Sequence, residues 1–570
     1  MLDGRLSVVG DYEQCLAAQS HGEGTNFSGK FCFLKPIIPH PNRKSFSTSH
    51  TKTSGNIQIP PALVDDIVDF LDLFNGTFVR FGVCFPSVCE ASEIEASINS
   101  VLYPLIRIPI QVGPDCQQKQ HKTPTQIYFS SNQYQKLAFW IFSGLFGLGI
   151  FASFIDVISR YRLSKLKDET LPQKTDQNDN VVSTLENTKP KRSIGMKLLM
   201  SFSIVGNTRE MFRINNKARF SSVDFIRFLM LNEIIVMHQY YVALGWSALP
   251  VSTRILSEEG LFQSVGSAQR YAFLRNIHNT DFFFALTGML ITYNTLRTLE
   301  RRKGSFNFIW YVISMYLRFY PAVFGAILMY YLLPLFGSGP FWSLLDEYHV
   351  ETCRRNLVPN ILSYNFYLLD LEEFTKHSMC NIASWWVTSC FHLIILAPII
   401  FLPMYHYRSC GFIWGLIFLI GGSTVSIAHI IYKEIPFMNQ IGAMNSILES
   451  SFYSIFYTWP FIHHIGPFVA GMLMGYLLRY APKLWLGGRI GETILSTIFI
   501  GTTVFGFIWT ERMLRNNVEL GDLITGPKEI SFESKLELYL NLTFGKVMFV
   551  SGFLWLFYLC STNRASKFLE

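Results

Sequence analysis

The chain has 570 residues, of which 49% are hydrophobic and only 16% are charged, and its formal net charge is +7. Soluble domains carry about 25% charged residues, so this composition excludes an ordinary soluble protein and predicts a polytopic membrane protein. The basic residues lie in short segments between hydrophobic stretches and form no basic groove with interleaved aromatic residues. We therefore expect membrane lipids, and no nucleic acid, as partners.

The first 135 residues combine cysteines with glycosylation sequons at Asn26 and Asn75. This combination indicates an oxidising compartment, and residues 1–135 are predicted to form a small, disulfide-stapled α+β domain on the extracellular or lumenal side. Five cysteines cannot all pair among themselves, so one is free or its partner lies elsewhere. The candidate disulfide cysteines of this domain and of a later polar loop are Cys15, Cys32, Cys84, Cys89, Cys116, Cys353 and Cys380.

Local patterns within this domain predict its elements. "PPALVDDIVDFLDLF" has helical periodicity, and "FVRFGVCFPSVCEASEIEASINSVL" predicts a strand, a turn and a helix. "MLDGRLSVVG" lacks the apolar stretch of a signal peptide. We expect either that the start of the chain is missing or that the first membrane helix directs insertion into the secretory pathway, at the endoplasmic reticulum or the plasma membrane.

A first membrane span is predicted at 136–159 and is followed by a basic segment, 160–220. The middle of that segment predicts a disordered linker. "SIGMKLLMSFSIVGNTREMFRI" fits an amphipathic helix on an anionic leaflet, and a short surface helix fits it equally well.

Residues 221–570 predict an all-α transmembrane domain, which brings the expected total to about nine spans. With the N-terminal domain outside, the basic connections fall on the cytosolic side, as the positive-inside rule requires. The remaining spans are predicted at 222–245, 281–297, 308–334, 383–404, 411–432, 460–479, 491–509 and 544–561.

The second span carries the ionisable residues Asp224, Arg227, Glu233 and His238, although such groups are costly in hydrocarbon. Asp224 and Arg227 lie one turn apart and can pair. Arg227 and His238 lie on the same helix face, about 16 Å apart along the axis. Purely structural roles remain open for three of these residues. His238 fits a packed histidine, Arg227 a snorkelling residue at the membrane interface, and Asp224 a charge at a helix N-terminus.

Other spans carry further polar residues. "NTDFFFALTGMLITY" includes Asp281 and Thr287, and "YLRFYP" places Arg318 at the end of a span. "HH" at 463–464 precedes Gly471 and Gly475, a spacing that more often indicates close helix packing than chemistry. Adjacent histidines point to different helix faces, so no metal site is expected.

Four motifs resemble the acyltransferase 3 superfamily. In order along the chain, they are Asp-x-x-Arg-x(10)-His, the Asp-x-Phe-Phe…Thr-Gly helix, Leu-Arg-x-x-Pro and Gly-Ser-Gly-Pro-x-Trp. "GDYEQCL", "GKFCFL" and "FGVCFPSVC" resemble the extracellular module of its animal branch, the nose-resistant-to-fluoxetine proteins. The resemblance covers nearly the whole chain. It implies a membrane-embedded acyltransferase that uses acyl-CoA as co-substrate and holds no bound cofactor.

The resemblance also implies roles for individual residues. His238 would be the catalytic base, and Arg227, paired with Asp224, would complete the catalytic group beside the acyl donor. A neutral imidazole suits proton abstraction near neutral pH, and guanidinium groups suit phosphates. The expected substrate-binding residues are Arg318, Asp281, Thr287, His392 and His464.

This chain departs from the family pattern at several positions. Cys390 stands where relatives carry an acid, His392 replaces a glutamine and His464 replaces an arginine. The chain also stops before the last two helices expected, which predicts truncation at the C-terminus. Two functions follow: an O-acyltransferase acting on a hydroxyl of a lipid, sterol or glycan, or a non-catalytic carrier or binding protein for lipids or lipophilic xenobiotics.

Overall fold

The computed structural model separates the chain into two compact units, 1–121 with 220–330 and 336–570, and 122–219 with 331–335. The described residues are 7–8, 11–22, 25–36, 80–106, 109–112, 116–118, 133–170, 193–213, 221–245, 278–336, 339, 350, 352–364, 380, 384–432, 460–485, 487–516, 536–537 and 539–564.

The N-terminal domain is a small mixed sheet built around one long strand, β3. Its antiparallel neighbours include β4, and β1 pairs with β4 in parallel. The predicted strand, turn and helix are confirmed as β4, a turn and α4, whereas the helix predicted over "PPALVDDIVDFLDLF" lies outside the described residues. The elements are β1 (Ser7–Val8), α1 (Tyr12–Ala17), β2 (Gln19–Gly22), β3 (Thr25–Pro36), β4 (Arg80–Pro86), α4 (Ala91–Ile106), β5 (Ile110–Val112) and β6 (Gln117–Gln118).

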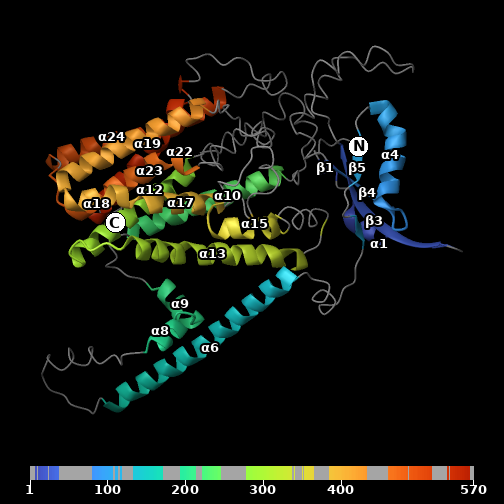
Figure 1. Cartoon of the computed structure of the whole chain (residues 1–570), viewed down its shortest axis with the longest axis horizontal. Coiled ribbons are helices and arrows are strands. Elements are labelled where there is room, and N and C mark those ends of the chain that lie inside the picture. The colour runs from blue at the N-terminus through green and yellow to red at the C-terminus, as the bar shows by residue number, and fades with distance from the viewer. Residues whose placement is uncertain are drawn as a thin grey trace. The chain divides into compact units, whose positions relative to one another are not determined.

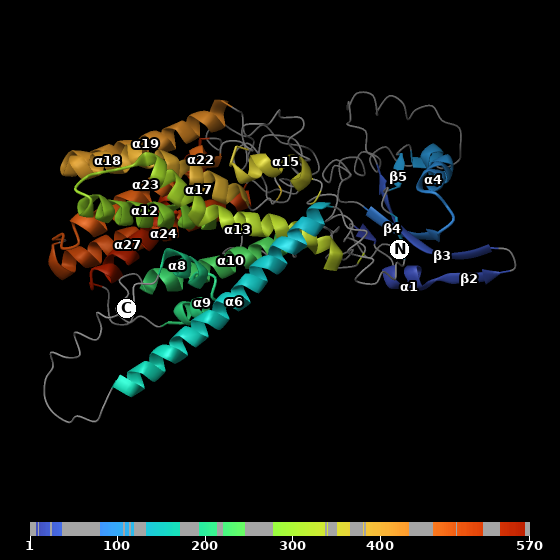
Figure 2. The same cartoon turned by 60° about the horizontal axis from the view of Figure 1, so that its bottom comes forward.

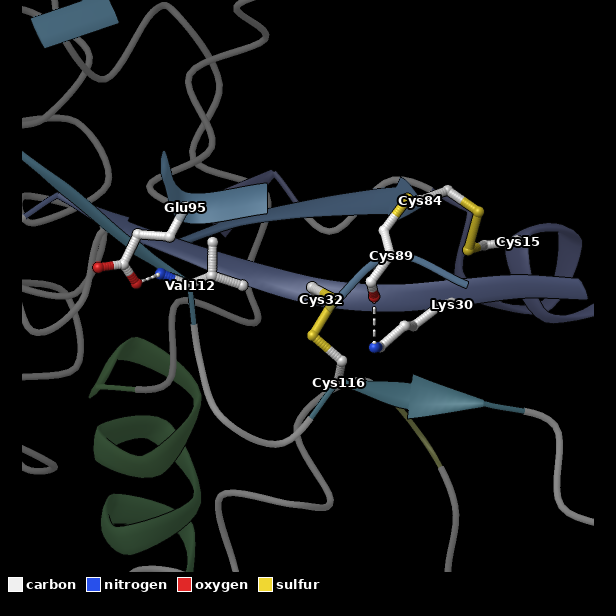
Figure 3. The surroundings of a disulfide bond; sticks show 8 residues. All are labelled: Cys15, Lys30, Cys32, Cys84, Cys89, Glu95, Val112 and Cys116. Carbon is white, nitrogen blue, oxygen red and sulfur yellow. Dashed lines mark hydrogen bonds between the residues drawn. A yellow bond between two sulfur atoms is a disulfide. The ribbon is translucent and has the colours of Figure 1, made fainter. Parts of the chain in front are cut away.

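Two disulfides staple this domain (Figure 3). Cys15–Cys84 ties α1 to β4, and Cys32–Cys116 ties β3 to the segment before β6. The predicted disulfides are confirmed for these four cysteines, whereas Cys89 is a thiol, so the disulfide role predicted for it is wrong for this structure. A small domain buries little apolar surface, so such cross-links supply stability that its core cannot.

The second unit is a long helix with two short helices docked on it. α6 (Gln133–Thr170) includes the first predicted span. α8 (Ile194–Met200) and α9 (Ile204–Met211) occupy the segment for which an amphipathic helix on a leaflet and a short surface helix were both open. The Ser153 hydroxyl accepts the backbone N–H of Ile204 at 2.9 Å, and Ser203 donates to Asp156 at 3.3 Å. This segment is therefore two short helices held on α6 by polar contacts.

The remaining helices pack into a bundle in which α12, α23 and α27 are largely buried (Figures 1 and 2). The bundle and its flanking helices are α10 (Ser221–Gly245), α12 (Asn279–Arg301), α13 (Phe308–Phe336), α15 (Thr352–Ile361), α17 (Ser384–Leu396), α18 (Pro398–His406), α19 (Arg408–Tyr432), α22 (Pro460–His463), α23 (Ile465–Tyr480), α24 (Gly488–Asn516), a π-helix (Asn541–Gly545) and α27 (Lys546–Ser561).

Within the described residues, six helical segments are long and apolar enough to cross a membrane, so the nine predicted spans are not all confirmed. The predicted spans at 222–245, 281–297 and 460–479 are helical but are absent from this set. α12 carries Asp281 in its first turn and Arg301 in its last, with several polar residues between them, and α23 has only 16 residues. The six segments are Gln133–Arg162, Phe308–Leu333, Ser384–His406, Cys410–Tyr432, Gly488–Thr510 and Asn541–Ser561.

Glycines set how closely α12 and α23 approach. A Cβ added at Gly471 would clash with the carbonyl oxygen of Ala285, and one at Gly475 would clash with that of Met289. Gly288 relieves the reciprocal clash against α23. From the contact of Gly471 with Ala285 to that of Gly475 with Met289, the residue numbers rise by four on both helices. The two helices therefore run parallel, and their N-terminal ends lie together. The packing role predicted for Gly471 and Gly475 is confirmed.

Candidate functional site

A buried acid–histidine pair lies where the N-terminal ends of α12 and α23 meet. Asp281 stands in the first turn of α12, and His464 is the residue immediately before α23. The Nδ1 atom of His464 lies 2.5 Å from Oδ1 of Asp281, and both side chains are fully buried. Helix N-termini favour negative charge, so two parallel N-terminal ends help to hold the carboxylate ionised away from water.

Aromatic rings hold the imidazole of His464 in one plane. The ring stacks on Phe284 with centroids 4.3 Å apart, and the Trp385 ring lies 5.5 Å away. With Nδ1 on Asp281, the Nε2 atom of His464 has no hydrogen-bond partner within the described part of the chain, and neither has the indole nitrogen of Trp386. Buried polar atoms are normally satisfied, so these two atoms are candidates to contact a substrate.

A second histidine extends the cluster to α24. His278 places Nδ1 at 3.5 Å from Oδ2 of Asp281 and Nε2 at 3.1 Å from the Thr510 hydroxyl. That hydroxyl donates to the carbonyl oxygen of Gly506 at 2.9 Å and also contacts the Asn541 side chain. Asp281 is thus flanked by imidazoles on both carboxylate oxygens.

A buried lysine compensates the charge of the carboxylate. Lys546, the first residue of α27, is almost fully buried, and its ammonium group donates to the carbonyl oxygen of His463 at 3.1 Å. It also attracts Asp281 electrostatically. An isolated buried charge is very costly, so the lysine and the aspartate stabilise each other inside the bundle.

α10 reaches the same region through Glu233. The side-chain amide of Asn279 donates to this buried carboxylate. His238, the predicted base, lies on α10 about 7.5 Å further along the axis, and its side chain lies outside the described residues. Asp224 and Arg227 form the predicted pair, with 3.1 Å between Oδ1 and Nη2, and both side chains are more than half exposed.

The other predicted site residues do not join the cluster through a direct contact. Arg318 is exposed on α13, with its guanidinium carbon 6.0 Å from the ring of Phe319. The Thr287 hydroxyl donates to the carbonyl oxygen of its own helix at 2.7 Å and lies near Cys390. His392 places Nδ1 at 2.7 Å from a carbonyl oxygen of its own helix and stacks on Phe461.

Of the predicted site residues, Asp281 and His464 are brought together, whereas Arg318, Thr287 and His392 contact other parts of the fold. Sequence reasoning missed His278, Lys546 and Thr510. A lysine at the start of the apolar segment 546–561 was a usable signal, because ionisable residues in such segments are rare. His278 and Thr510 carry no comparable signal in the sequence.

The later cysteines differ from the prediction. The structure has Cys353 and Cys380 as buried thiols beside each other, so the disulfide predicted there is wrong for this structure. The neighbouring Cys380 and burial raise the pKa of the Cys353 thiol well above its usual value. Asn26 lies in β3, with its side chain outside the description, and Asn75 lies outside the described residues, so use of either sequon stays a prediction.

No group of three or more histidine, cysteine or acidic side chains within the described ranges has the arrangement of a metal site. Comparisons with curated proteins and with solved structures found no match. The likeness of residues 221–570 to the acyltransferase 3 superfamily therefore stays a prediction. Residues 1–98 match the family model described as the nose resistant-to-fluoxetine protein, N-terminal domain, so the chain carries this module ahead of a set of apolar membrane helices.

Proposed function

We propose that this protein is a membrane O-acyltransferase that moves an acyl group from acyl-CoA to a hydroxyl of a lipid, sterol or glycan. The observation that carries the proposal is the buried pair of Asp281 and His464, whose Nε2 atom has no hydrogen-bond partner among the described residues. The N-terminal module, which is associated with membrane acyltransferase-like proteins, supports the same class.

The pair suits proton transfer. Asp281 fixes Nδ1 of His464, so Nε2 is the basic atom and takes the proton of an acceptor hydroxyl. The hydroxyl oxygen attacks the thioester carbonyl, the carbon–sulfur bond breaks, and the thiolate of coenzyme A receives the proton. Asp281 stabilises the imidazolium that forms between these steps, which is where its negative charge is worth most.

The residues expected from the resemblance take complementary roles in this proposal. Arg227 lies on an exposed face of α10, where its guanidinium group pairs with Asp224 and would also meet the phosphates of coenzyme A. His238 is the rival base on the same helix. Variants of His464 and His238 therefore decide which imidazole accepts the proton.

The test is transfer of radiolabelled acyl groups from acyl-CoA to lipids in membranes that contain the full chain. His464→Gln should lower transfer on the order of 10²–10⁴-fold, the usual contribution of a general base. His406→Gln is the matched control, because His406 is an exposed histidine at the end of α18. Transfer no greater than in membranes without the chain would remove the enzymatic proposal, and equal transfer by the wild type, His464→Gln and His238→Ala would exclude both imidazoles as the base.

The second candidate is a carrier for lipids or lipophilic compounds. Cys390, which stands where relatives carry an acid, is fully buried beside Thr287. A site without that acid suits passage of an amphiphile better than catalysis. Uptake of a fluorescent lipid into cells, together with absent acyl transfer in the wild type, would support the carrier over the enzyme.

A further inference from the structure

A serine and two histidines form a continuous hydrogen-bonded chain on the side of the bundle where α19 meets α22. The Ser426 hydroxyl lies 2.8 Å from Nδ1 of His463, and Nε2 of His463 lies 3.0 Å from Nδ1 of His429. Ser426 and His463 are buried, and His429 is half-buried. Neither Ser426 nor His429 contacts the Asp281–His464 pair through a hydrogen bond among the described contacts.

The hydroxyl of Ser426 behaves differently from its neighbours on α19. Ser423 and Thr424 donate to carbonyl oxygens one turn back on their own helix, at 3.0 Å each. This is the usual way for a helix to satisfy a buried hydroxyl. Ser426 instead directs its hydroxyl to an imidazole of another helix. Local helix geometry does not account for that choice, so the contact with His463 depends on tertiary packing.

Close packing holds this arrangement in place. A Cβ added at Gly422, one turn before Ser426, would clash with the side chain of Ile465. Gly466 is packed less tightly, because a Cβ there would lie 3.0 Å from the Val547 side chain and 3.2 Å from the Ser423 hydroxyl. Lys546 donates to the backbone carbonyl of His463 and so fixes the residue that carries the central imidazole.

We propose that Ser426 is a nucleophile that holds the acyl group as a covalent acyl-serine, with His463 as its base and His429 as the group that orients His463. The inference rests on the proposed acyl transfer, replaces the direct attack described above by two steps through an acyl-serine, and gives His463 the base role that the one-step route gives His464. A serine within hydrogen-bond reach of an imidazole that is oriented by a third group is the arrangement that activates a hydroxyl. The substrate class is a thioester of a long-chain fatty acid, because α19 lies in an apolar candidate membrane span.

Both half-reactions balance without a further reactant. In the first, the Ser426 oxygen attacks the thioester carbonyl, His463 Nδ1 takes the hydroxyl proton, and the departing thiolate receives it. In the second, the acceptor hydroxyl attacks the serine ester, its proton goes to His463, and the serine oxygen regains a proton from the same imidazole. His429 Nδ1 accepts the N–H of His463 Nε2 throughout and thereby fixes the tautomer.

The burial of Ser426 limits which reagents can reach its hydroxyl. Ser426 is 2% exposed, so an acyl chain reaches the hydroxyl only when side chains that cover it move aside. A membrane-soluble reagent is therefore the right probe. An alkyl fluorophosphonate partitions into the apolar phase, reacts with activated serine hydroxyls and releases fluoride.

The first experiment treats the full chain in detergent with a tagged alkyl fluorophosphonate and identifies the modified residue by peptide mass spectrometry. We expect labelling at Ser426, its loss in Ser426→Ala and a rate at least about 10²-fold lower in His463→Phe. Ser423→Ala is the matched control and should label like the wild type. No labelling at Ser426 in the wild type overturns the proposal, and that measurement does not depend on whether any variant folds.

The second experiment separates failure of this inference from failure of the proposed function. Radiolabelled acyl-CoA is supplied without acceptor, and the protein is examined for an ester that hydroxylamine cleaves. Label on the peptide that contains Ser426 supports the intermediate. Transfer to acceptor at the wild-type rate by folded Ser426→Ala overturns the intermediate and leaves acyl transfer intact. If the wild type transfers nothing, the proposed function fails, and fluorophosphonate labelling alone decides the reactivity of Ser426.

Discussion

Asp281 is the residue at which charges in the bundle converge. It contacts imidazoles through both carboxylate oxygens and is attracted by the buried ammonium group of Lys546. An ion pair inside a protein gains little over apolar packing, but removal of one partner leaves the other charge uncompensated. The energetics of the cluster therefore depend on whether both charges are present.

Lys546→Met is expected to destabilise the fold by roughly 3–5 kcal/mol, because the carboxylate then lies in the bundle without its cation. Lys546→Met combined with Asp281→Asn should lose less than the sum of the two single variants, because no charge is left uncompensated. The loss of stability in each variant is measured in detergent by heating the protein and recording by size-exclusion chromatography how much folded protein remains.

Lys483→Met provides the control for that series, since Lys483 is exposed in the turn after α23. Its melting temperature should stay at the wild-type value. Strictly additive losses in the double variant would show that Lys546 and Asp281 do not stabilise each other.

At the scale of elements, the pairing of α12 with α23 decides where the site residues lie. The glycines of both helices allow backbone-to-backbone approach, and the ion pair of Glu300 with Arg479 joins the helices at their C-terminal ends. Because the helices run parallel, the same packing brings Asp281 and His464 together at the other end. The site is thus a consequence of helix packing rather than of a local motif.

Gly471→Ala is expected to lower the free energy of unfolding by roughly 1–3 kcal/mol, because its Cβ would meet the backbone of α12 and force the helices apart. Acyl transfer should fall with it, since the distance between Asp281 and His464 depends on that packing. Thermal melting and the transfer assay measure the two effects.

Gly501→Ala on α24 is the matched control, because a Cβ there meets nothing within 4 Å. It should leave the fold unchanged or stabilise it by up to about 1 kcal/mol through higher helix propensity. A loss at Gly501 as large as that at Gly471 would contradict an interface origin of the effect.

At the scale of the whole molecule, the chain joins a disulfide-stapled module to a set of membrane helices. The four disulfide cysteines lie ahead of α6, which fits an extracellular or lumenal N-terminal module. Basic connections between the predicted spans favour a cytosolic location for the opposite face of the bundle, and this orientation stays a prediction. The proposed acyl donor would enter from that cytosolic face.

Loss of the Cys15–Cys84 disulfide in Cys15→Ser/Cys84→Ser should destabilise the N-terminal module by roughly 2–5 kcal/mol, because the cross-link closes a long loop of the unfolded chain. Limited proteolysis of the purified full chain in detergent should then cut the module faster than in the wild type. Cys89→Ser is the control and should be cut at the wild-type rate, since Cys89 is a thiol in the structure. Equal protection in all three proteins would show that the disulfide does not stabilise the module.

Composition and local periodicity were sufficient to predict the membrane class, the stapled module and most of the helices, because these features depend on neighbours in sequence. The Asp224–Arg227 pair was predictable for the same reason, since one helical turn separates the two residues. The odd thiol among the first five cysteines was predictable as a count, but its identity as Cys89 depended on which strands pair.

The tertiary structure alone decided which polar residues meet. Asp281 and His464 are 183 positions apart, and Ser426 and His463 are 37 apart, so neither contact follows from helical periodicity. Both depend on glycines that let particular helices approach, and that choice of partner is made by packing across the whole bundle. The sequence by itself therefore determined that charged groups would lie among apolar helices, and the packing of α12, α19, α22 and α23 determined that they form acid–histidine and serine–histidine contacts.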